Sequence, residues 1–135
     1  AQDFSGYVRF LKNQGAPESA AAGSLPQSTY WLMHQNQKIY GVSRLRHCLS
    51  PSLDLHGGHI SLAIQPSMRR KGCGSACLLL TLQKARQLGL NRVLLTCDAG
   101  NLASIHMIRK CGGQLDHRDL EITHPSTYHF WINLE

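Results

Sequence analysis

The chain has 135 residues, of which 42% are hydrophobic and 16% are charged, which suits one compact domain and excludes a wholly disordered chain. Lysine and arginine number 14 against 8 for aspartate and glutamate, and the resulting net charge of +6 favours an anionic partner without identifying it. No apolar run approaches the roughly 20 residues that span a bilayer, so we expect no membrane-spanning segment.

The first residues show helical periodicity. Apolar side chains recur at i, i+3, i+4 and i+7 from Phe4 to Leu11, behind Asp3 as a candidate N-cap, and Gly15 ends the pattern. Residues 17–28 are rich in alanine, glycine, serine and proline, which is the composition of a loop. The sequence therefore predicts a short helix followed by a loop.

Three strands are predicted next. Residues 29–33 and 38–47 are β-rich runs separated by four polar residues, as in a hairpin. An irregular segment around Pro51 comes after them. Residues 59–64 then form an apolar run of strand length, which Pro66 ends.

A helix and a buried strand follow. Apolar side chains between Leu78 and Leu88 repeat at i, i+4, i+7 and i+10 with polar residues between them, and Gly89 closes the helix. Residues 93–95 are continuously apolar, as in a strand that is buried on both faces. Together with the preceding strand, they predict a parallel strand–helix–strand unit.

The last third contains one more helix and a pair of strands. Asn101 is a candidate N-cap for a helix that Gly112 and Gly113 end. Residues 115–122 and 127–134 are predicted as a closing pair of strands. The pattern predicts an α/β domain.

We expect a single domain, with a helix and loop over residues 1–28 and a core over residues 29–134. The five cysteines are odd in number and form no Cys-x-x-Cys pair, so they support neither a disulfide framework nor a zinc ribbon. A reducing cytoplasm fits them best. Eight histidines include no HExxH pattern, and we expect no metal site.

The turn before the main helix carries the strongest functional signal. Arg69, Arg70 and Lys71 are consecutive and lead into Gly72 and Gly74. A helix N-terminus offers backbone N–H groups and a positive dipole end, and glycine lets phosphate oxygens approach closely, so the turn suits a pyrophosphate. The pattern is neither a P-loop nor a dinucleotide fingerprint. The alternative is an ordinary turn beside a solvated basic face.

Two blocks of this sequence resemble the GNAT N-acetyltransferase superfamily. The first is Arg69-x-x-Gly72-x-Gly74, after a strand and before a leucine-rich helix, which resembles the acyl-CoA signature. The second is Asn101-x-Ala103-Ser104 through Lys110-x-Gly112-Gly113, at the expected distance. Shorter matches over residues 29–31, 44–47, 57–60 and 130–132 resemble a bacterial subgroup known only as predicted acetyltransferases.

The resemblance implies a GNAT-like acyl-CoA N-acyltransferase fold, in which a mixed, mostly antiparallel sheet flanked by helices splays at its middle to admit acetyl-CoA. It implies that Ala63 and Ile64 pair with the pantetheine arm, that backbone N–H groups from Arg70 to Ser75 hold the pyrophosphate, and that Asn101 contacts the pantetheine. The cofactor-binding candidates are Ala63, Ile64, Arg69, Arg70, Lys71, Gly72, Cys73, Gly74, Ser75 and Asn101. Because the chain starts at Ala1 within a predicted helix, we expect the N-terminal strand of the family to be missing and the native N-terminus to lie upstream.

Two catalytic positions depart from the family pattern. Ile108 occupies the slot where many relatives carry a tyrosine that protonates the leaving thiolate, and no glutamate precedes the strand over residues 59–64. The titratable groups nearest the inferred acyl site are His47, His56 and His59, which are candidate general bases or histidines packed at strand ends.

Other polar residues have two interpretations each. Asp98, at the end of a strand, either binds the amine or caps the turn before Asn101. Arg44 and Arg46 project from the same strand face, where they either bind an anionic group of the acceptor or form a solvated surface.

The leading hypothesis is an N-acetyltransferase that moves an acetyl group from acetyl-CoA to a primary amine by direct attack in a ternary complex. The acceptor would be a small molecule or a peptide, and a homodimer is left open. The alternative is a non-catalytic CoA-binding or regulatory module of the same fold, because the usual acid and base are missing. A nucleic-acid-binding domain rests on net charge alone and is not expected, nor is membrane association.

Overall fold

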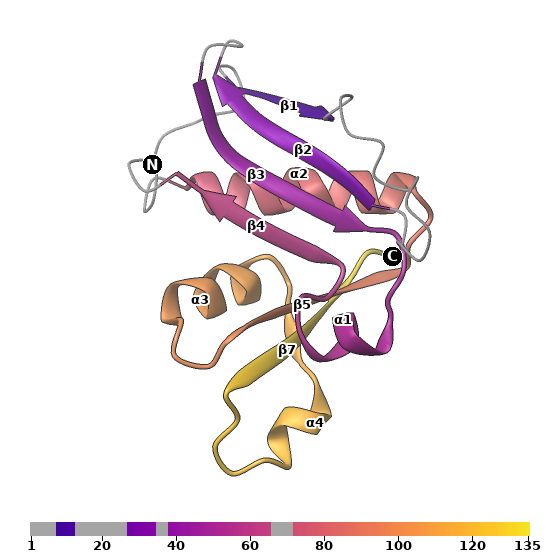
Figure 1. The fold of residues 1–135 in the computed structure, drawn as a ribbon, viewed down its shortest axis with the longest axis vertical. Helices are drawn as coiled ribbons and strands as arrows, with labels where there is room; N and C mark the ends of the chain where they lie inside the picture. The colour runs from indigo at the N-terminus through magenta and orange to yellow at the C-terminus, as the bar shows by residue number, and fades with distance from the viewer. Residues whose placement is uncertain (1–7, 13–26, 35–37, 66–71) are drawn as a thin grey trace.

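The structure is a computed structural model that describes residues 8–12, 27–34, 38–65 and 72–135 (Figure 1). The described strands are β1 Val8–Lys12, β2 Gln27–His34, β3 Lys38–Arg46, β4 Ile60–Ile64, β5 Arg92–Asp98, β6 Gln114–Leu115 and β7 Thr127–Asn133. The described helices are α1 Pro51–Leu55, α2 Cys73–Gln87, α3 Leu102–Lys110 and α4 His117–Leu120. The α/β prediction is confirmed.

The first sheet has the order β1-β2-β3-β4, and each neighbouring pair is antiparallel. The predicted hairpin is confirmed as β2 and β3, whose register shifts between Leu32 and Met33. Helix α2 packs on this sheet, where the hydroxyl groups of Ser43 and Thr81 form a buried hydrogen bond of 2.7 Å.

The N-terminal helix prediction is wrong. Residues 8–12 form the edge strand β1, in which Phe10 is the register partner of Leu32. Valine and phenylalanine favour strands, and pairing with β2 supplies backbone hydrogen bonds along a whole sheet edge, which outweighs a weak helical periodicity. The expected absence of an N-terminal strand is corrected with it, since β1 precedes the hairpin of β2 and β3.

The second sheet has the order β5-β7-β6, with β7 in the centre. The strand predicted over residues 115–122 is wrong beyond Leu115, because the backbone turns into α4. Asp116 caps that helix by accepting a hydrogen bond of 2.9 Å from the N–H of Arg118. The chain before the fourth strand is also more regular than expected, since Ser50 caps α1 and Pro51 begins it.

The two sheets meet at one point and then separate. The N–H of His59, next to the start of β4, donates a 2.7 Å hydrogen bond to the carbonyl of Leu94 on β5. Beyond it the two strands diverge (Figure 1). The predicted splaying of the sheet is therefore a complete division into two antiparallel sheets, and the strand–helix–strand unit of β4, α2 and β5 bridges them.

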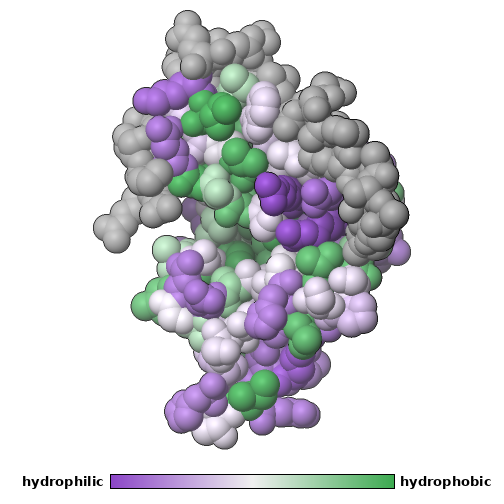
Figure 2. All heavy atoms as spheres, in the orientation of Figure 1, coloured by the Kyte–Doolittle hydropathy of each residue, from purple (hydrophilic) through white to green (hydrophobic). Residues whose placement is uncertain are grey.

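One hydrophobic core nevertheless joins the two halves. It includes Tyr30 and Leu45 from the first sheet, Leu78 from α2, and Val93 and Phe130 from the second sheet. A smaller cluster of Leu32, Cys73 and Cys77 lies under the start of α2. Figure 2 shows hydrophobic surface continuing into the recess between the first sheet and α3.

Candidate functional site

A cavity of about 370 Å³ lies where β4 and β5 diverge. Its walls come from the two strands, from α3, and from the chain just after α1. The lining residues are His56, Ile60, Ser61, Leu62, Leu95, Thr96, Cys97, Asp98, Asn101, Ser104, Met107, Ile108 and Thr127. Of the predicted site residues, His56 and Asn101 lie in this wall.

His59 holds the two strands together at the closed end of the cavity. Its side chain is buried, and its Nδ1 accepts a 2.9 Å hydrogen bond from the N–H of Leu94, the same residue whose carbonyl accepts the N–H of His59. Burial lowers the pKa of His59, and the nearby charge of Arg92 lowers it further. His59 therefore joins the two strands as a neutral hydrogen-bond acceptor. It is not among the described residues that line the cavity.

Gly58 permits the close contact between the two strands next to His59. Its backbone has φ +63, and a Cβ atom there would collide with the carbonyl oxygen of Leu94. No side chain fits between the strands at this position. The glycine pair that resembles the family motif thus has a defined steric role at the point where the sheets meet.

His56 is exposed at the cavity wall, and the residues on both sides of it are held in place. The carbonyl of Leu55 accepts a hydrogen bond of 2.9 Å from Nε2 of His129. The N–H of Gly57 donates one of 2.8 Å to the hydroxyl of Thr96 on β5. The backbone around His56 is therefore fixed to the second sheet on either side.

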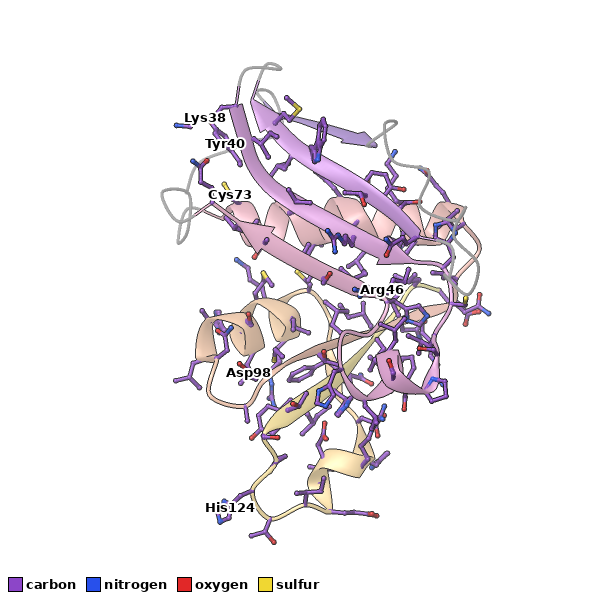
Figure 3. All side chains as sticks on the ribbon, in the orientation of Figure 1. Lys38, Tyr40, Arg46, Cys73, Asp98 and His124 are labelled. Atoms are coloured by element: carbon purple, nitrogen blue, oxygen red, sulfur yellow. The ribbon has the colours of Figure 1, made fainter. Side chains whose placement is uncertain are left out.

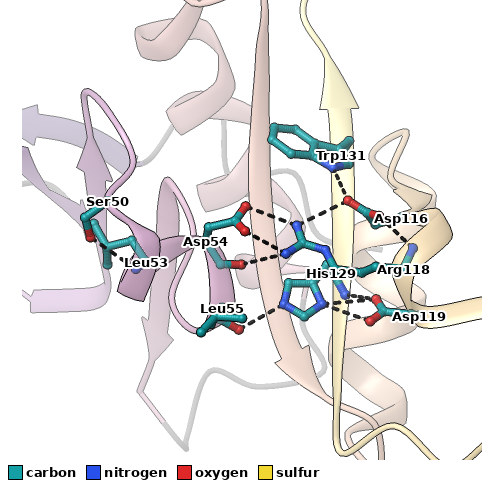
Figure 4. A network of polar contacts seen from close by, with 9 residues as sticks. All are labelled: Ser50, Leu53, Asp54, Leu55, Asp116, Arg118, Asp119, His129 and Trp131. Atoms are coloured by element: carbon teal, nitrogen blue, oxygen red, sulfur yellow. Dashed lines mark hydrogen bonds and ion pairs between the residues drawn. The ribbon is translucent and has the colours of Figure 1, made fainter. Parts of the chain in front are cut away.

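A polar network under α1 supports this arrangement (Figure 4). The guanidinium of Arg118 binds both carboxylate oxygens of Asp54 at 2.7 and 3.1 Å, and it lies 3.2 Å from Asp116. Asp116 in turn accepts a 2.7 Å hydrogen bond from the indole N–H of Trp131. The hydrogen bond from Arg118 lowers the pKa of Asp54.

The centre of the network is a buried pair of His129 and Asp119, whose side chains are 8% and 1% exposed. Nδ1 of His129 lies 3.0 and 3.1 Å from the two carboxylate oxygens, and Nε2 faces the carbonyl of Leu55. The ring of His129 therefore bridges the carboxylate of Asp119 on α4 and the main chain at the end of α1. Sequence analysis missed this pair; the signal was a polar residue at a core position of the last strand.

The remaining predicted polar residues lie apart from the cavity wall. Nε2 of His47 is 2.9 Å from the hydroxyl of Ser28, at the far end of the first hairpin. Arg46 donates a 3.2 Å hydrogen bond to the carbonyl of Gly58, so it supports the turn rather than a solvated face. Arg44 is exposed.

The wall formed by α3 begins with a capped turn. The side-chain oxygen of Asn101 accepts a 3.2 Å hydrogen bond from the N–H of Ser104, which confirms the predicted N-cap. The N–H of Asn101 donates to the backbone carbonyl of Asp98 at 2.9 Å, so the main chain of Asp98 closes the turn. Ile108 is 2% exposed in the protein, and its side chain forms part of the wall.

The start of α2 has the geometry expected of an anion-binding turn. Gly72 has φ +85, and the first helical hydrogen bond runs from the N–H of Ala76 to the carbonyl of Gly72. The N–H groups of Gly74 and Ser75 precede that bond and have no acceptor within the helix. A Cβ on Gly74 would lie 2.8 Å from the sulfur of Met107, so this turn packs closely against α3.

Several cofactor candidates can be placed only in part. Ala63 and Ile64 lie on β4, paired with Val42 and Gly41 of β3 on one side. Arg69, Arg70 and Lys71 lie outside the described residues.

The cysteines near the site are poor nucleophiles. Burial raises the pKa of the Cys77 thiol to about 12. Cys97, in the cavity wall, has a raised pKa because of burial and the neighbouring charges of Asp98 and Asp119. These two thiols thus give no support to a covalent cysteine intermediate.

Residues 4–113 match the model of the acetyltransferase (GNAT) family. The chain belongs to the GNAT family. The recognition from two sequence blocks is therefore confirmed, and so is the predicted fold class. GNAT enzymes take the acetyl group from acetyl-CoA, so the predicted cosubstrate agrees with the family. No curated protein sequence matches the chain.

Solved structures with the same fold share little sequence with this GNAT chain. A GNAT acetyltransferase from Streptococcus pneumoniae is 22% identical, with TM-score 0.62, over 84% of this chain and 70% of that one. IAA acetyltransferase from Bacillus cereus is 14% identical, with TM-score 0.64, over 93% and 99%. A candidate acetyltransferase from Salmonella typhimurium, solved with its cofactor acetyl-CoA, is 16% identical, with TM-score 0.63, over 81% and 65%. This chain therefore spans about two thirds of the Salmonella protein.

Two kinds of feature are absent from the described residues. None of the described helices is both long enough and apolar enough to cross a membrane. Within the same part of the chain, no group of three or more His, Cys, Asp or Glu side chains is placed to hold a metal ion.

Proposed function

We propose that this GNAT domain is an N-acetyltransferase that moves the acetyl group of acetyl-CoA to a primary amine. The observation that carries the proposal is the divergence of β4 and β5 beside the N-terminus of α2, with a cavity of about 370 Å³ between the strands. The Salmonella protein with this fold binds acetyl-CoA. A cleft of that shape beside a helix N-terminus suits a ligand with a long neutral arm and a pyrophosphate.

The residues at the start of α2 fit such a ligand. Gly72 adopts a left-handed backbone conformation, and the N–H groups of Gly74 and Ser75 are available to phosphate oxygens. Ala63 and Ile64 would hold the pantetheine from β4, and Asn101 would contact it from α3. Arg69, Arg70, Lys71 and Cys73 complete the proposed set by their place in the sequence.

We assign the general base to His56 among the three histidine candidates. It is the one that lines the cavity, whereas His59 is engaged with Leu94 and His47 with Ser28. A neutral imidazole can remove a proton from the acceptor ammonium through water. The freed amine then attacks the thioester carbonyl, the C–N bond forms as the C–S bond breaks, and the electron pair leaves with sulfur. The proton that the nitrogen loses as it becomes an amide passes to solvent.

The leaving group needs little acid assistance. A thiol pKa near 8.5 lies only about one to two units above neutral pH, so the CoA sulfur can leave as a thiolate at little cost. Ile108 supplies no proton, so we propose that solvent protonates the thiolate and that backbone N–H groups stabilise its charge.

Calorimetry of acetyl-CoA binding, together with CoA release on a panel of primary amines, tests the proposal. We expect Gly72→Val to weaken acetyl-CoA binding by about tenfold or more, because a branched side chain blocks the approach of phosphate to the turn. Gly89→Val is the matched control: Gly89 has φ +87 at the other end of α2 and has open space around its Cβ position. Equal affinities of the two variants would contradict the placement of the cofactor.

The alternative function is a CoA-binding module without catalysis. Ile108 in the tyrosine slot is the observation that favours it. Such a module would bind acetyl-CoA with the same sensitivity to Gly72→Val but would release no CoA with any amine.

A further inference from the structure

The cavity wall contains a carboxylate at the end of β5. Asp98 is the last residue of that strand and is exposed, and its register partner on β7, Thr127, also lines the cavity. Figure 3 shows Asp98 where β5 passes into the turn before α3. A substrate that enters the cavity beside this turn meets the carboxylate.

The described part of this wall has a charge opposite to that of the chain. Among the described residues that line the cavity there is no lysine or arginine, and Asp98 is the one carboxylate, although the chain carries +6. His56 is the other titratable nitrogen or oxygen group in the wall. A negative charge at the cavity of a positively charged chain is a property of this site and does not follow from the composition.

The carboxylate of Asp98 has no structural task among the described residues. The turn before α3 is closed by the main-chain carbonyl of Asp98, and the helix is capped by Asn101. The interpretation of Asp98 as a side-chain cap is therefore not supported. By contrast, Asp54 and Asp116 form ion pairs with Arg118, and Asp119 is hydrogen-bonded to His129, within the described part of the chain.

We propose that Asp98 binds a second ammonium group of the acceptor, so that the preferred substrates are diamines or polyamines. This inference rests on the proposed acetyl transfer. One nitrogen of the acceptor must be neutral to attack, while another keeps its proton and forms a charge-assisted hydrogen bond with the carboxylate. An acceptor with its own carboxylate, such as a free amino acid, meets like charge at the same place.

A pair of matched substrates isolates this contact. Hexane-1,6-diamine and hexylamine have the same chain and differ by one ammonium group. We expect wild-type kcat/KM to be about tenfold higher for the diamine, the size of a charge-assisted hydrogen bond. In Asp98→Asn the preference should disappear, with acetyl-CoA affinity unchanged.

Glu121→Gln is the matched control variant. It removes the same charge from an exposed position outside the cavity and should keep the diamine preference. Calorimetry with the diamine in the presence of CoA gives a second readout, in which Asp98→Asn should bind about tenfold more weakly.

The outcomes separate the two proposals. Robust CoA release without a diamine preference, or an equal preference in Asp98→Asn and wild type, overturns the inference and leaves the acetyltransferase intact. Failure to bind acetyl-CoA, or binding without CoA release from any amine, overturns the proposed function itself. Loss of the diamine preference in Glu121→Gln as well would show a long-range charge effect and would also overturn the role of Asp98.

Discussion

At the scale of single residues, His56 is the side chain whose surroundings are best suited to chemistry. It is exposed to the cavity, yet Leu55 before it and Gly57 after it are both hydrogen-bonded to residues of the second sheet. A base that is fixed in position but solvated at its tip can pass a proton to water without a conformational step.

We expect His56→Ala to lower kcat by about 10² to 10⁴ with little change in the KM for acetyl-CoA. His124→Ala is the control, because His124 is exposed at the end of the molecule away from the cavity (Figure 3). Steady-state kinetics at neutral pH measures kcat and the KM for acetyl-CoA of both variants. Near wild-type turnover of His56→Ala would show that hydroxide or bound water accepts the proton instead.

The tyrosines are expected to be dispensable for chemistry. Tyr30, Tyr40 and Tyr128 do not belong to the cavity wall, which Ile108 occupies at the family's tyrosine slot. Each Tyr→Phe variant should keep kcat within a few-fold of wild type, whereas loss of a general acid costs about a hundredfold or more. A drop of that size in one variant, with intact CoA affinity, would identify an acid that reaches the sulfur after substrate binding.

At the scale of elements, the contact between β4 and β5 depends on His59. Its pKa is lowered from about 6.5, mainly by burial, so the unfolded chain binds more protons than the folded one between the lowered pKa and about 6.5. The contribution of His59 to stability is fully present above pH 6.5 and is lost as the pH falls through the lowered value.

His59→Asn tests this dependence. The side-chain oxygen of asparagine can accept the N–H of Leu94 in place of Nδ1, but it does not titrate. Thermal unfolding between pH 7.5 and 5 should show a smaller loss of stability in His59→Asn than in wild type. Identical pH profiles would assign the acid sensitivity to other groups.

The contacts that hold α1 and α4 together are unequal in strength. Arg118 and Asp54 form an ion pair whose side chains are 29% and 42% exposed, and Arg118→Ala should cost about 1 kcal/mol or less. His129→Ala removes the ring that contacts the buried carboxylate of Asp119 and the carbonyl of Leu55, and the loss of these buried hydrogen bonds should cost more, about 3 kcal/mol. Urea unfolding of both variants measures the difference. Equal losses would mean that Asp119 finds another partner.

At the scale of the whole molecule, sequence patterns predicted the elements that carry strong local signals. The long periodicity of α2, the hairpin of β2 and β3, and the cap at Asn101 are all present. The strand β1 was missed because its stability comes from pairing with a distant segment, which local periodicity does not report. The turn into α4 was missed for the same reason, since contacts from Asp54 and Trp131 fix it.

The candidate site was predictable where backbone geometry defines it. The turn at Gly72 and the cap at Asn101 could be predicted because glycine and a capping residue have few other uses at those places, and their role in cofactor binding stays a prediction. The sequence could not predict that His56, and not His59, faces the cavity. His59 lies where β4 meets β5, and these two strands are distant in sequence, so local patterns do not report their contact.

The division into two sheets raises the question of whether they unfold together and how a ligand between them changes stability. A single core cluster contains residues of both sheets and of α2, so the halves should unfold together in one transition. A ligand that fills the space between β4 and β5 binds only the folded state, and CoA at a hundred times its Kd should add about 2.7 kcal/mol of stability.

Calorimetric scans with and without CoA measure this effect. We expect one transition that moves to higher temperature by several degrees, and a much smaller shift in Gly72→Val than in Gly89→Val, because only the former alters the turn before α2. Hydrogen exchange locates the change: amides of β4 that face β5 should exchange more slowly with CoA bound, while those of β7, already paired on both sides over Trp131 and Phe130, should change little. Two separate transitions, of which CoA moved only one, would show that the two sheets are independent units and that the cleft between them is not the cofactor site.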